Sequence, residues 1–416
     1  MTRRPLHIAV AGAGVGGLSA AIALHLSGHR VQIFDQFEAP QPVGSGLVVQ
    51  PVGQRVLDWV GVGDRARALG ARITTLHGIE ARTGAGTLRV RYDAGAPGRF
   101  GLGMHRASLF AALHDRLTAL GLRVETGCEV VGSSLAAGAR VLHLADGRQV
   151  GGFDLVVDAL GSHSPLSSLN PAPLPYGALW TTLHWPEGSE IPQDRLSQHY
   201  VAARRMVGVL PIGRLPDDPT PRAAFFWSLR GDAVANWQAR GLEAWKAEVL
   251  DIWPALAPFL AQITDPDQLF FARYAHGTLR KSWAEGLVHI GDSAHRTSPQ
   301  LGQGANMALL DSLALTQALR QADLADALPL YARIRRGHLR VYQSMSRFLT
   351  PQYQSDSAAL AVLRDRVVAP LARIWPMPRV MGAVASGLIV PPLGGEPYHA
   401  GKPIAPDWAV DASKGR

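Results

Sequence analysis

The sequence predicts a mixed α/β chain that contains two kinds of sheet, and three observations lead to that prediction. The apolar run at 6–11 is followed by clustered glycines and then, at 18–26, by apolar residues at helical spacing, which is typical of a buried parallel strand leading into a helix. An apolar run, a glycine-rich loop and a helical pattern recur in that order at 286–322. Between these segments, residues 176–271 hold short β-like runs and six tryptophans, which indicates an antiparallel sheet with a helix on one face.

The first glycine loop has the spacing of a dinucleotide-binding turn. Gly12, Gly14 and Gly17 form a G-x-G-x-x-G pattern between the predicted strand and helix. The first glycine permits a sharp turn, the second leaves room for a pyrophosphate, and the third lets the helix pack against the strand. Asp35 ends a second β-like run at 30–34, where a carboxylate can accept hydrogen bonds from ribose hydroxyls. We therefore expect phosphates at the start of this helix, where free amides and the helix dipole favour anions.

The next segments alternate between the two predicted units. Two β-like runs within 73–92 flank a Thr-Gly-Ala-Gly turn, which predicts a hairpin of the second sheet. Arg106 then stands in the first turn of a helix that is predicted to end near Gly121. A helix start favours anions, so we expect this arginine to reach an anion on a ligand; the alternative is an exposed surface arginine. Closely spaced prolines at 171–175 mark a boundary, because proline is excluded from sheet interiors.

A second strand-end loop precedes the helix predicted to end near Ala322. Asp292 ends the apolar run and can accept a hydrogen bond from a ribityl hydroxyl, although a plain capping role for its carboxylate is the alternative. The helix start near Gly304 can face a developing negative charge on a ring carbonyl. The sequence therefore predicts two amide-rich helix starts that serve one ligand.

Composition limits the classes of protein that fit. A chain of 416 residues exceeds one ordinary core, so we expect two domains. The net charge of +8 could indicate a nucleic-acid binder, but there are only four lysines and the arginines are scattered, which argues against that alternative. A single cysteine, Cys128, excludes an internal disulfide framework and a multi-cysteine metal site, and we expect no metal. With no room for a signal peptide before the first strand, we expect a cytoplasmic protein.

These segments together are similar to a known family. The first glycine loop, Arg106, the strand-end loop at 158–165 and the segment at 291–306 resemble, in that order and spacing, the single-component FAD-dependent aromatic hydroxylases, which are para-hydroxybenzoate hydroxylase-like flavoprotein monooxygenases. The resemblance covers roughly residues 6–345 and implies a Rossmann-like FAD-binding domain of the glutathione-reductase type, an inserted antiparallel-sheet substrate domain and C-terminal helices. It implies the following FAD contacts: Gly12, Gly14, Val15, Gly16, Gly17, Asp35, Gln36, Gly46, Leu47, Arg106, Val130, Asp292, Gly302, Gln303, Gly304, Ala305 and Asn306.

The resemblance also implies a reaction. Flavin reduced by a nicotinamide adds dioxygen to give a C4a-hydroperoxide, whose distal oxygen attacks an electron-rich carbon of an aromatic or polyketide-like substrate. Pro299 is implied on the flavin and oxygen side, whereas no general base is identifiable. The middle segment departs from the family pattern, because Leu160 stands where an aspartate is usual and Ser167 where an arginine is expected. Two hypotheses remain: the chain uses NAD(P)H through other arginines, or a partner reductase supplies reduced flavin.

The resemblance and the composition shifts together divide the chain. We expect an FAD-binding domain in three parts, 1–72, 100–172 and 272–345, a substrate-domain hairpin at 73–99, a substrate-binding sheet at 173–271, and a helical cover at 346–416. No apolar run is long enough to span a membrane. The broken apolar and basic helices of the cover either pack on the substrate sheet or touch a membrane peripherally.

Substrate contacts are predicted on the tryptophan-bearing sheet. Gln198, Met206 and Trp227 lie on strands that we expect to border an aromatic or apolar substrate, although a shift of one residue would turn each side chain to the other face. Two other activities remain open. One is a redox-silent FAD-binding protein of the same fold. The other, a flavin-dependent halogenase, is disfavoured because the chain has no lysine before Lys246.

Overall fold

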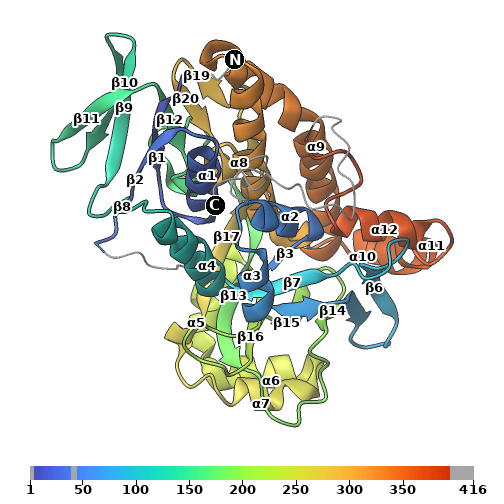
Figure 1. The fold of residues 1–416 in the computed structure, drawn as a ribbon. Helices are drawn as coiled ribbons and strands as arrows, with labels where there is room; N and C mark the ends of the chain where they lie inside the picture. The colour runs from blue at the N-terminus through green and yellow to red at the C-terminus, as the bar shows by residue number, and fades with distance from the viewer. Residues whose placement is uncertain (1–3, 39–44, 394–416) are drawn as a thin grey trace.

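A parallel sheet carries the N-terminal strand, as the sequence predicted. The computed structural model describes residues 4–38 and 45–393. Within these residues, six strands pair in the order β19-β20-β12-β1-β2-β8, all parallel except β19 (Figure 1). Their bounds are β1 His7–Ala11, β2 Arg30–Phe34, β8 Val124–Glu125, β12 Leu155–Asp158, β19 Trp283–Ala284 and β20 Leu287–His289. Apolar side chains on β1 and β12 are fully buried, which is why these strands read as unbroken apolar runs.

A second, larger sheet contains the strands of the predicted substrate unit. Seven strands of the described chain pair in the order β17-β13-β16-β15-β14-β5-β6. Their bounds are β5 Thr75–Glu80, β6 Gly86–Arg91, β13 Pro173–His184, β14 Arg195–Val201, β15 Arg205–Pro211, β16 Arg222–Arg230 and β17 Phe270–Ala275. The predicted hairpin is confirmed as β5 and β6, which extend this sheet at one edge. Strands of the two sheets interleave along the chain, and the exact domain boundaries stay a prediction.

The predicted boundary coincides with the start of a strand. Strand β13 begins at Pro173, but it also includes Pro175, whereas proline was expected to be excluded from the sheet interior. Its pairing with β17 skips register between Pro173 and Gly177, so the missing proline N–H groups fall where the ladder is interrupted.

Helices cover both sheets. The parallel sheet packs against α1, α4 and α8 in one apolar core, and α5–α7 cover one face of the seven-stranded sheet with a second core (Figure 1). Their bounds are α1 Val15–Leu26, α2 Pro51–Trp59, α3 Gly63–Leu69, α4 Arg106–Ala119, α5 Val234–Arg240, α6 Leu242–Ile252, α7 Ala257–Leu260, α8 Gly304–Gln321, α9 Leu324–Tyr353, α10 Ala358–Leu363, α11 Ala369–Leu371 and α12 Met377–Ala385. None of the described helices is both long and apolar enough to cross a membrane.

Smaller sheets complete the fold. These are β3 Gly46–Val49, β4 Ala71–Ile73 and β7 Gly101–His105 in one sheet, β9 Val130–Ala136, β10 Ala139–Leu144 and β11 Gln149–Phe153 in another, and the pair β18 Gly277–Thr278 and β21 His295–Arg296. The first of these sheets lies between the two large sheets, because β3 and β7 pack directly on residues of β15 and β16. It therefore joins the parallel sheet to the seven-stranded sheet.

Candidate functional site

Three loops leave adjacent strands of the parallel sheet at the same edge. The last residues of β1, β12 and β20 stand in register, Ala11 opposite Asp158 and Asp158 opposite His289. Backbone hydrogen bonds continue past the strand ends, from Ala159 N to Ala11 O at 2.8 Å and from Ile290 N to Asp158 O at 3.0 Å. Ligands of open parallel sheets bind at the carboxyl ends of the strands. The three loops that the sequence singled out therefore meet at one edge of the sheet, where a ligand is expected.

The glycine loop has the geometry that its spacing predicts. Gly12 has φ +100°, and a Cβ there would lie 2.6 Å from Ala159 O. At Gly17 a Cβ would lie 1.8 Å from Gly12 O, so helix α1 packs on the turn itself. Gly14 differs, because a Cβ at this position meets no atom within 4 Å. It is the N-cap of α1 and gives that helix no side-chain cap, so the first amides of α1 face open space.

The end of β2 closes this loop. Asp35 is half-buried, and its carboxylate accepts hydrogen bonds from Ala13 N at 2.6 Å and Phe37 N at 3.2 Å. Each carboxylate oxygen keeps a further lone pair for a hydroxyl donor. Gln36 is exposed beside it. Val130, at the start of β9, is buried in the same apolar cluster as Phe34 at the end of β2.

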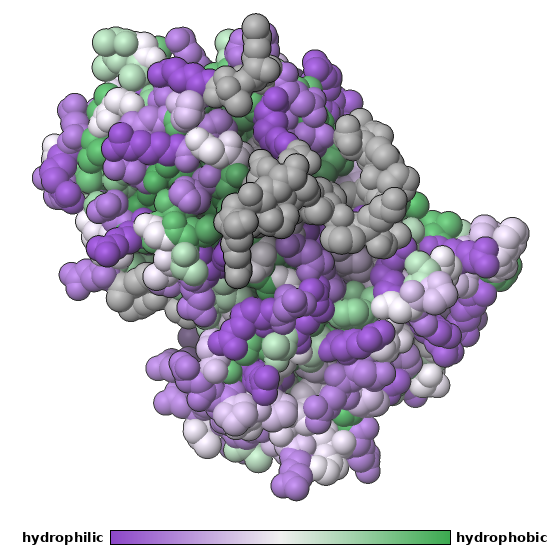
Figure 2. Space-filling model, viewed as in Figure 1, coloured by the Kyte–Doolittle hydropathy of each residue, from purple (hydrophilic) through white to green (hydrophobic). Residues whose placement is uncertain are grey.

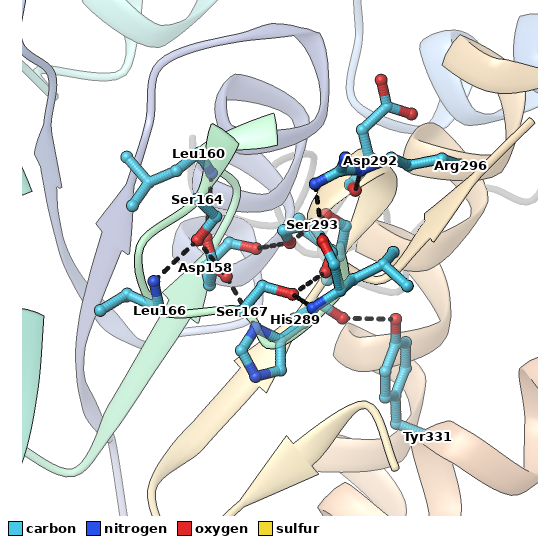
Figure 3. Close-up of polar contacts among 12 residues, drawn as sticks. Asp158, Leu160, Ser164, Leu166, Ser167, His289, Asp292, Ser293, Arg296 and Tyr331 are labelled. Carbon is cyan, nitrogen blue, oxygen red and sulfur yellow. Dashed lines mark hydrogen bonds and ion pairs between the residues drawn. The ribbon is translucent and has the colours of Figure 1, made fainter. Parts of the chain in front are cut away.

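Asp158 anchors the middle loop instead of facing a ligand (Figure 3). Its buried carboxylate accepts hydrogen bonds from Ser164 Oγ at 2.7 Å and from Leu160 N at 3.1 Å, and it lies 2.7 Å from His289 Nδ1. Ser293 Oγ donates to the backbone oxygen of Asp158 at 2.8 Å. The aspartate thus ties the ends of β12 and β20 together. Sequence reasoning missed this role of His289, since its partner lies 131 residues away.

The two unusual positions of the middle loop also have structural partners. Ser167 Oγ donates to Ser293 O at 2.6 Å, and Leu160 packs against the apolar cluster that contains Phe34. The guanidinium of Arg296, from the third loop, donates to Leu169 O at 2.8 Å and also contacts Ser162 O. The middle loop is therefore held by an arginine from another segment.

The carboxylate of Asp292 projects out of this cluster (Figure 3). The residue is exposed, while its neighbours Gly291 and Ser293 are buried, and the alternative capping role is not seen because the turn here has no side-chain cap. An exposed carboxylate on a buried turn can accept hydrogen bonds from a ligand hydroxyl.

The loop before α8 is shaped around Asn306. Asn306 Nδ2 donates to Val48 O at 3.0 Å and Gly302 O at 2.8 Å, and its Oδ1 accepts from Gln50 N at 2.8 Å. Asn306 is fully buried, so its predicted contact with a cofactor stays a prediction. Gly302 has φ +59°, which reverses the chain before the helix.

Helix α8 begins at Gly304 with no side-chain cap, so its first amides, including that of Ala305, are free. Gln303 precedes it, with Nε2 donating to Ala385 O at 3.1 Å and a buried Oε1 that has no partner among the described residues. Pro299 is exposed at the start of a 3₁₀ turn just before this loop. The helix start offers hydrogen-bond donors to a polar ligand, whereas the oxygen of Gln303 is buried.

A buried ionic cluster supports the third loop from below, and the sequence analysis did not identify it. Asp311 Oδ2 accepts from Gly291 N at 2.9 Å and lies 2.6 Å from His295 Nε2, while Oδ1 accepts from Arg335 Nε at 2.7 Å. Burial by itself raises the pKa of Asp311, but the charges of His295 and Arg335 outweigh it and lower the pKa to about 2. The sequence feature that could have indicated this cluster is Asp311 itself, an aspartate inside an otherwise apolar helical run.

Gly46 and Leu47 lie on β3 of the small sheet that joins the two large ones, and Arg106 begins α4 directly after β7 of that sheet. Gly46 pairs with His105, and the backbone N of Arg106 donates to Ser45 O at 3.1 Å. The side chain of Arg106 is exposed. A Cβ at Gly46 would lie 2.3 Å from Ile212, so this glycine is needed for close packing on the substrate sheet. Their contacts to a cofactor stay predictions.

Two of the three predicted substrate residues share a face of the substrate sheet. Gln198 and Met206 are buried on adjacent strands, with Gln198 Nε2 3.3 Å from Met206 Sδ, beside Phe226. Trp227 does not join them: it packs edge-on against Trp245 in the core under α6. Alternation along β16 turns neighbouring residues to opposite faces, which is the ambiguity that the sequence left open.

The polar edge of the third loop borders a cavity of about 290 Å³. Two residues that line this cavity are bonded to the third loop. Thr350 of α9 shares a hydrogen bond of 2.7 Å with Ser298, and Gln354, just after α9, accepts one of 3.0 Å from Gln300. None of the predicted cofactor contacts is among its lining residues. Across the described chain, no group of three or more His, Cys, Asp or Glu is placed to hold a metal ion.

Comparisons with known proteins agree with this geometry. The family described as FAD binding domain matches residues 6–327. The chain is 29% identical to the FAD-dependent monooxygenase OpS4 of Beauveria bassiana over 80% of this chain and 82% of that protein. It is 24% identical to 3-hydroxybenzoate 6-hydroxylase 1 of Aquipseudomonas alcaligenes, over 87% and 93%. The crystal structure of Klebsiella pneumoniae HpxO complexed with FAD and uric acid has a similar fold, with a TM-score of 0.75, 21% identity and coverage of 93% and 97%.

Proposed function

This chain belongs to the FAD binding domain family, and from that premise we propose that it is a monooxygenase that hydroxylates an aromatic or polyketide-like small molecule. The observation that carries the proposal is the convergence of the glycine loop, the Asp158 loop and the 291–306 loop at one edge of the parallel sheet. The relatives reported above, which include monooxygenases and a hydroxylase, support the reaction type.

The open positions of the site fit FAD. We infer that the uncapped start of α1 at Gly14 receives the diphosphate and that Asp35 accepts from the ribose hydroxyls. The exposed carboxylate of Asp292 is suited to the ribityl hydroxyls, and the uncapped start of α8 at Gly304 to a ring carbonyl that gains negative charge. When bound, FAD supplies the electron transfer and the activation of dioxygen, which no side chain here can provide.

The substrate sheet supplies an apolar cover for the reacting atoms. Phe226 and Met206 form a cluster with Tyr200 on the face that does not carry α5–α7, and Trp180 packs on Phe226 with ring centroids 4.7 Å apart. The indole of Trp180 donates to Tyr274 OH at 2.7 Å, which fixes its orientation. Such a surface excludes water from the reacting atoms and orients a flat apolar molecule. It favours an aromatic substrate with few charged groups.

The source of electrons separates two versions of the proposal. Because Ser167 and Leu160 serve to hold the middle loop, these positions offer neither the acid nor the arginine of the family pattern to a nicotinamide. We propose direct reduction by NADH or NADPH as the first version and delivery of reduced flavin by a partner reductase as the second. Stopped-flow mixing of the FAD-loaded protein with NADH or NADPH, in the presence of substrate, decides: rapid flavin bleaching eliminates the second version.

The monooxygenase proposal itself is tested by oxygen uptake. Reduced FAD-loaded protein is mixed with oxygen and a panel of phenols and quinolones, and uptake and hydroxylated product are measured together. Product formed in step with oxygen consumption is expected. The contrary result is tight FAD binding with no product from any compound of the panel and only hydrogen peroxide on reoxidation. That result would favour the alternative in which the protein binds FAD without acting as an oxygenase. A reducing cytoplasm remains the proposed location, in keeping with the single cysteine.

A further inference from the structure

The helical segment after α9 presents large apolar side chains to solvent. Helices α10 and α11 are joined by a π-helical turn, Arg364–Val368, into one continuous segment, 358–371. Its outward side chains, together with the two residues that follow at 374 and 375, form what we call the apolar lobe face: Val362, Leu363, Val367, Leu371, Ile374 and Trp375, which are between 42% and 75% exposed. Leu363, Val367 and Leu371 recur every four residues, so they lie along one side of the segment.

The inward side of this segment lacks the large apolar side chains that an ordinary surface helix buries. Its buried members are Ala361, Ala369 and the guanidinium of Arg364, which is fully buried. A surface helix of a globular protein normally turns its large apolar side chains inward and its charges outward. The polarity of this segment is therefore inverted with respect to the body of the protein.

Arg364 holds the segment in this orientation. Its guanidinium donates to Gln352 O at 2.9 Å, to Ala202 O at 3.0 Å and to both carboxylate oxygens of Asp365 at 2.8 and 3.0 Å. It also lies over the rings of Tyr200 and Tyr353, 5.0 and 5.2 Å from their centroids. Turning the segment inside out would break all of these contacts and leave the backbone oxygens of Gln352 and Ala202 without the donor that Arg364 supplies. The outward position of the apolar lobe face is thus specified by the fold.

Charge around the apolar lobe face is one-sided. Residues 357–393 contain four arginines and one aspartate, and that aspartate, Asp365, is paired with Arg364. Arg366, Arg373 and Arg379 are exposed among or next to the apolar side chains. In Figure 1 these helices form a lobe beside β6 that projects from the body of the molecule, and in Figure 2 green hydrophobic residues are visible along the outer edge of this lobe. The lobe can therefore meet a flat surface without obstruction from the body.

We propose that the apolar lobe face binds the surface of an anionic lipid bilayer. Interfacial segments combine exposed Trp, Leu, Ile and Val with arginines and no spanning run, which is the composition found here. The arginines attract acidic headgroups, and Trp375 with Ile374 enters the boundary between headgroups and acyl chains. Binding would keep the protein beside the phase in which an apolar aromatic substrate dissolves. A second copy of the chain would need acidic residues to complement these arginines, and the face offers none of its own.

The experiment is cosedimentation of the full-length, FAD-loaded protein with vesicles of phosphatidylcholine, with and without phosphatidylglycerol. The protein is expected to sediment with the anionic vesicles and to be released by salt. A double variant, Ile374→Asp with Trp375→Asp, is expected to bind at least about tenfold more weakly, since it puts two charges in place of apolar side chains. Arg366→Gln is expected to weaken binding by about fivefold and to reduce its salt dependence.

Phe270→Asp is the matched control. Phe270 is 69% exposed on β17, at the edge of the seven-stranded sheet opposite β6. This variant also replaces an exposed aromatic by a carboxylate, so it is expected to bind vesicles as the unchanged protein does.

Three outcomes would overturn the proposal. One is an unchanged protein that stays in the supernatant with anionic vesicles. Another is a double variant that sediments with anionic vesicles as strongly as the unchanged protein. The third is a dimer of the unchanged protein and a monomer of the double variant in sedimentation velocity, with no vesicle binding by either protein. That result would identify the apolar lobe face as a contact between two copies of the chain. Flavin content and thermal unfolding, measured in each variant, show whether the fold and the cofactor site are intact.

Discussion

Replacing Gly14 by valine should separate cofactor binding from folding. The backbone at Gly14 has φ −69° and ψ −178°, an extended conformation that suits a β-branched residue. A Cβ there meets no atom within 4 Å, so the side chain enters open space. We expect the unfolding free energy of the flavin-free variant to lie within about 1 kcal/mol of the unchanged protein, because valine only restricts the unfolded chain.

FAD binding should respond very differently to Gly14→Val. The side chain would occupy the space before the free amides of α1, where we place the diphosphate. Two charge-assisted hydrogen bonds at about 1.5 kcal/mol each amount to about 3 kcal/mol, or a loss of roughly 100-fold in affinity. The measurements are thermal unfolding without flavin and titration of FAD by quenching of its fluorescence.

The matched control for Gly14→Val is Gly337→Val. Gly337 is exposed in α9, and a Cβ there also meets no atom within 4 Å, so this variant should bind FAD normally. Unchanged FAD affinity of Gly14→Val would refute the placement of the diphosphate. A Gly14→Val protein that does not fold without flavin would refute the reading of this position as open space.

The other predictions concern the core and the substrate face. Asp311→Asn should lower the unfolding free energy in urea by about 3 kcal/mol, because the buried charge of Arg335 loses its counter-charge; a loss below about 1 kcal/mol would contradict this. Burial, followed by the charge of Arg335, lowers the pKa of His338 to about 3. Because the unfolded chain takes up this proton more readily than the folded protein, the unfolding free energy should fall as the pH drops from about 6.5 toward 3. His338→Gln should flatten that slope in thermal unfolding against pH. Met206→Leu should change the KM for substrate at unchanged Tm, whereas Trp227→Phe should lower Tm and leave KM unchanged; the reverse result would reject the assignment of the two faces.

Local patterns accounted for the parts of the molecule in which the chain interacts with its neighbours in sequence. The strand at 30–34 matches β2, and the roles of Gly12 and Gly17 follow from a turn that spans six residues. These features depend on the backbone preferences of glycine and on the burial of continuous apolar strands. The order of the loops along the chain was likewise sufficient to predict the family to which the chain belongs.

Contacts between distant segments decided the rest. Asp158 proved to be an anchor because His289 and Ser293, more than 130 residues away, complete its hydrogen bonds. Trp227 and Met206 lie on opposite faces because strand register depends on pairing across the whole sheet.

Arg364 shows the same limit in the helical cover. The sequence identified a basic and apolar segment but left two positions for it, since either face of an amphipathic helix can turn inward until its partners are known. The ring of Tyr200 and the backbone oxygen of Ala202 come from one distant part of the chain, and those of Tyr353 and Gln352 from another; together they hold the arginine inside. The sequence by itself therefore determined the family and the glycine-rich loops at the strand ends. The direction in which side chains face came only from tertiary packing, because it depends on partners that are remote along the chain.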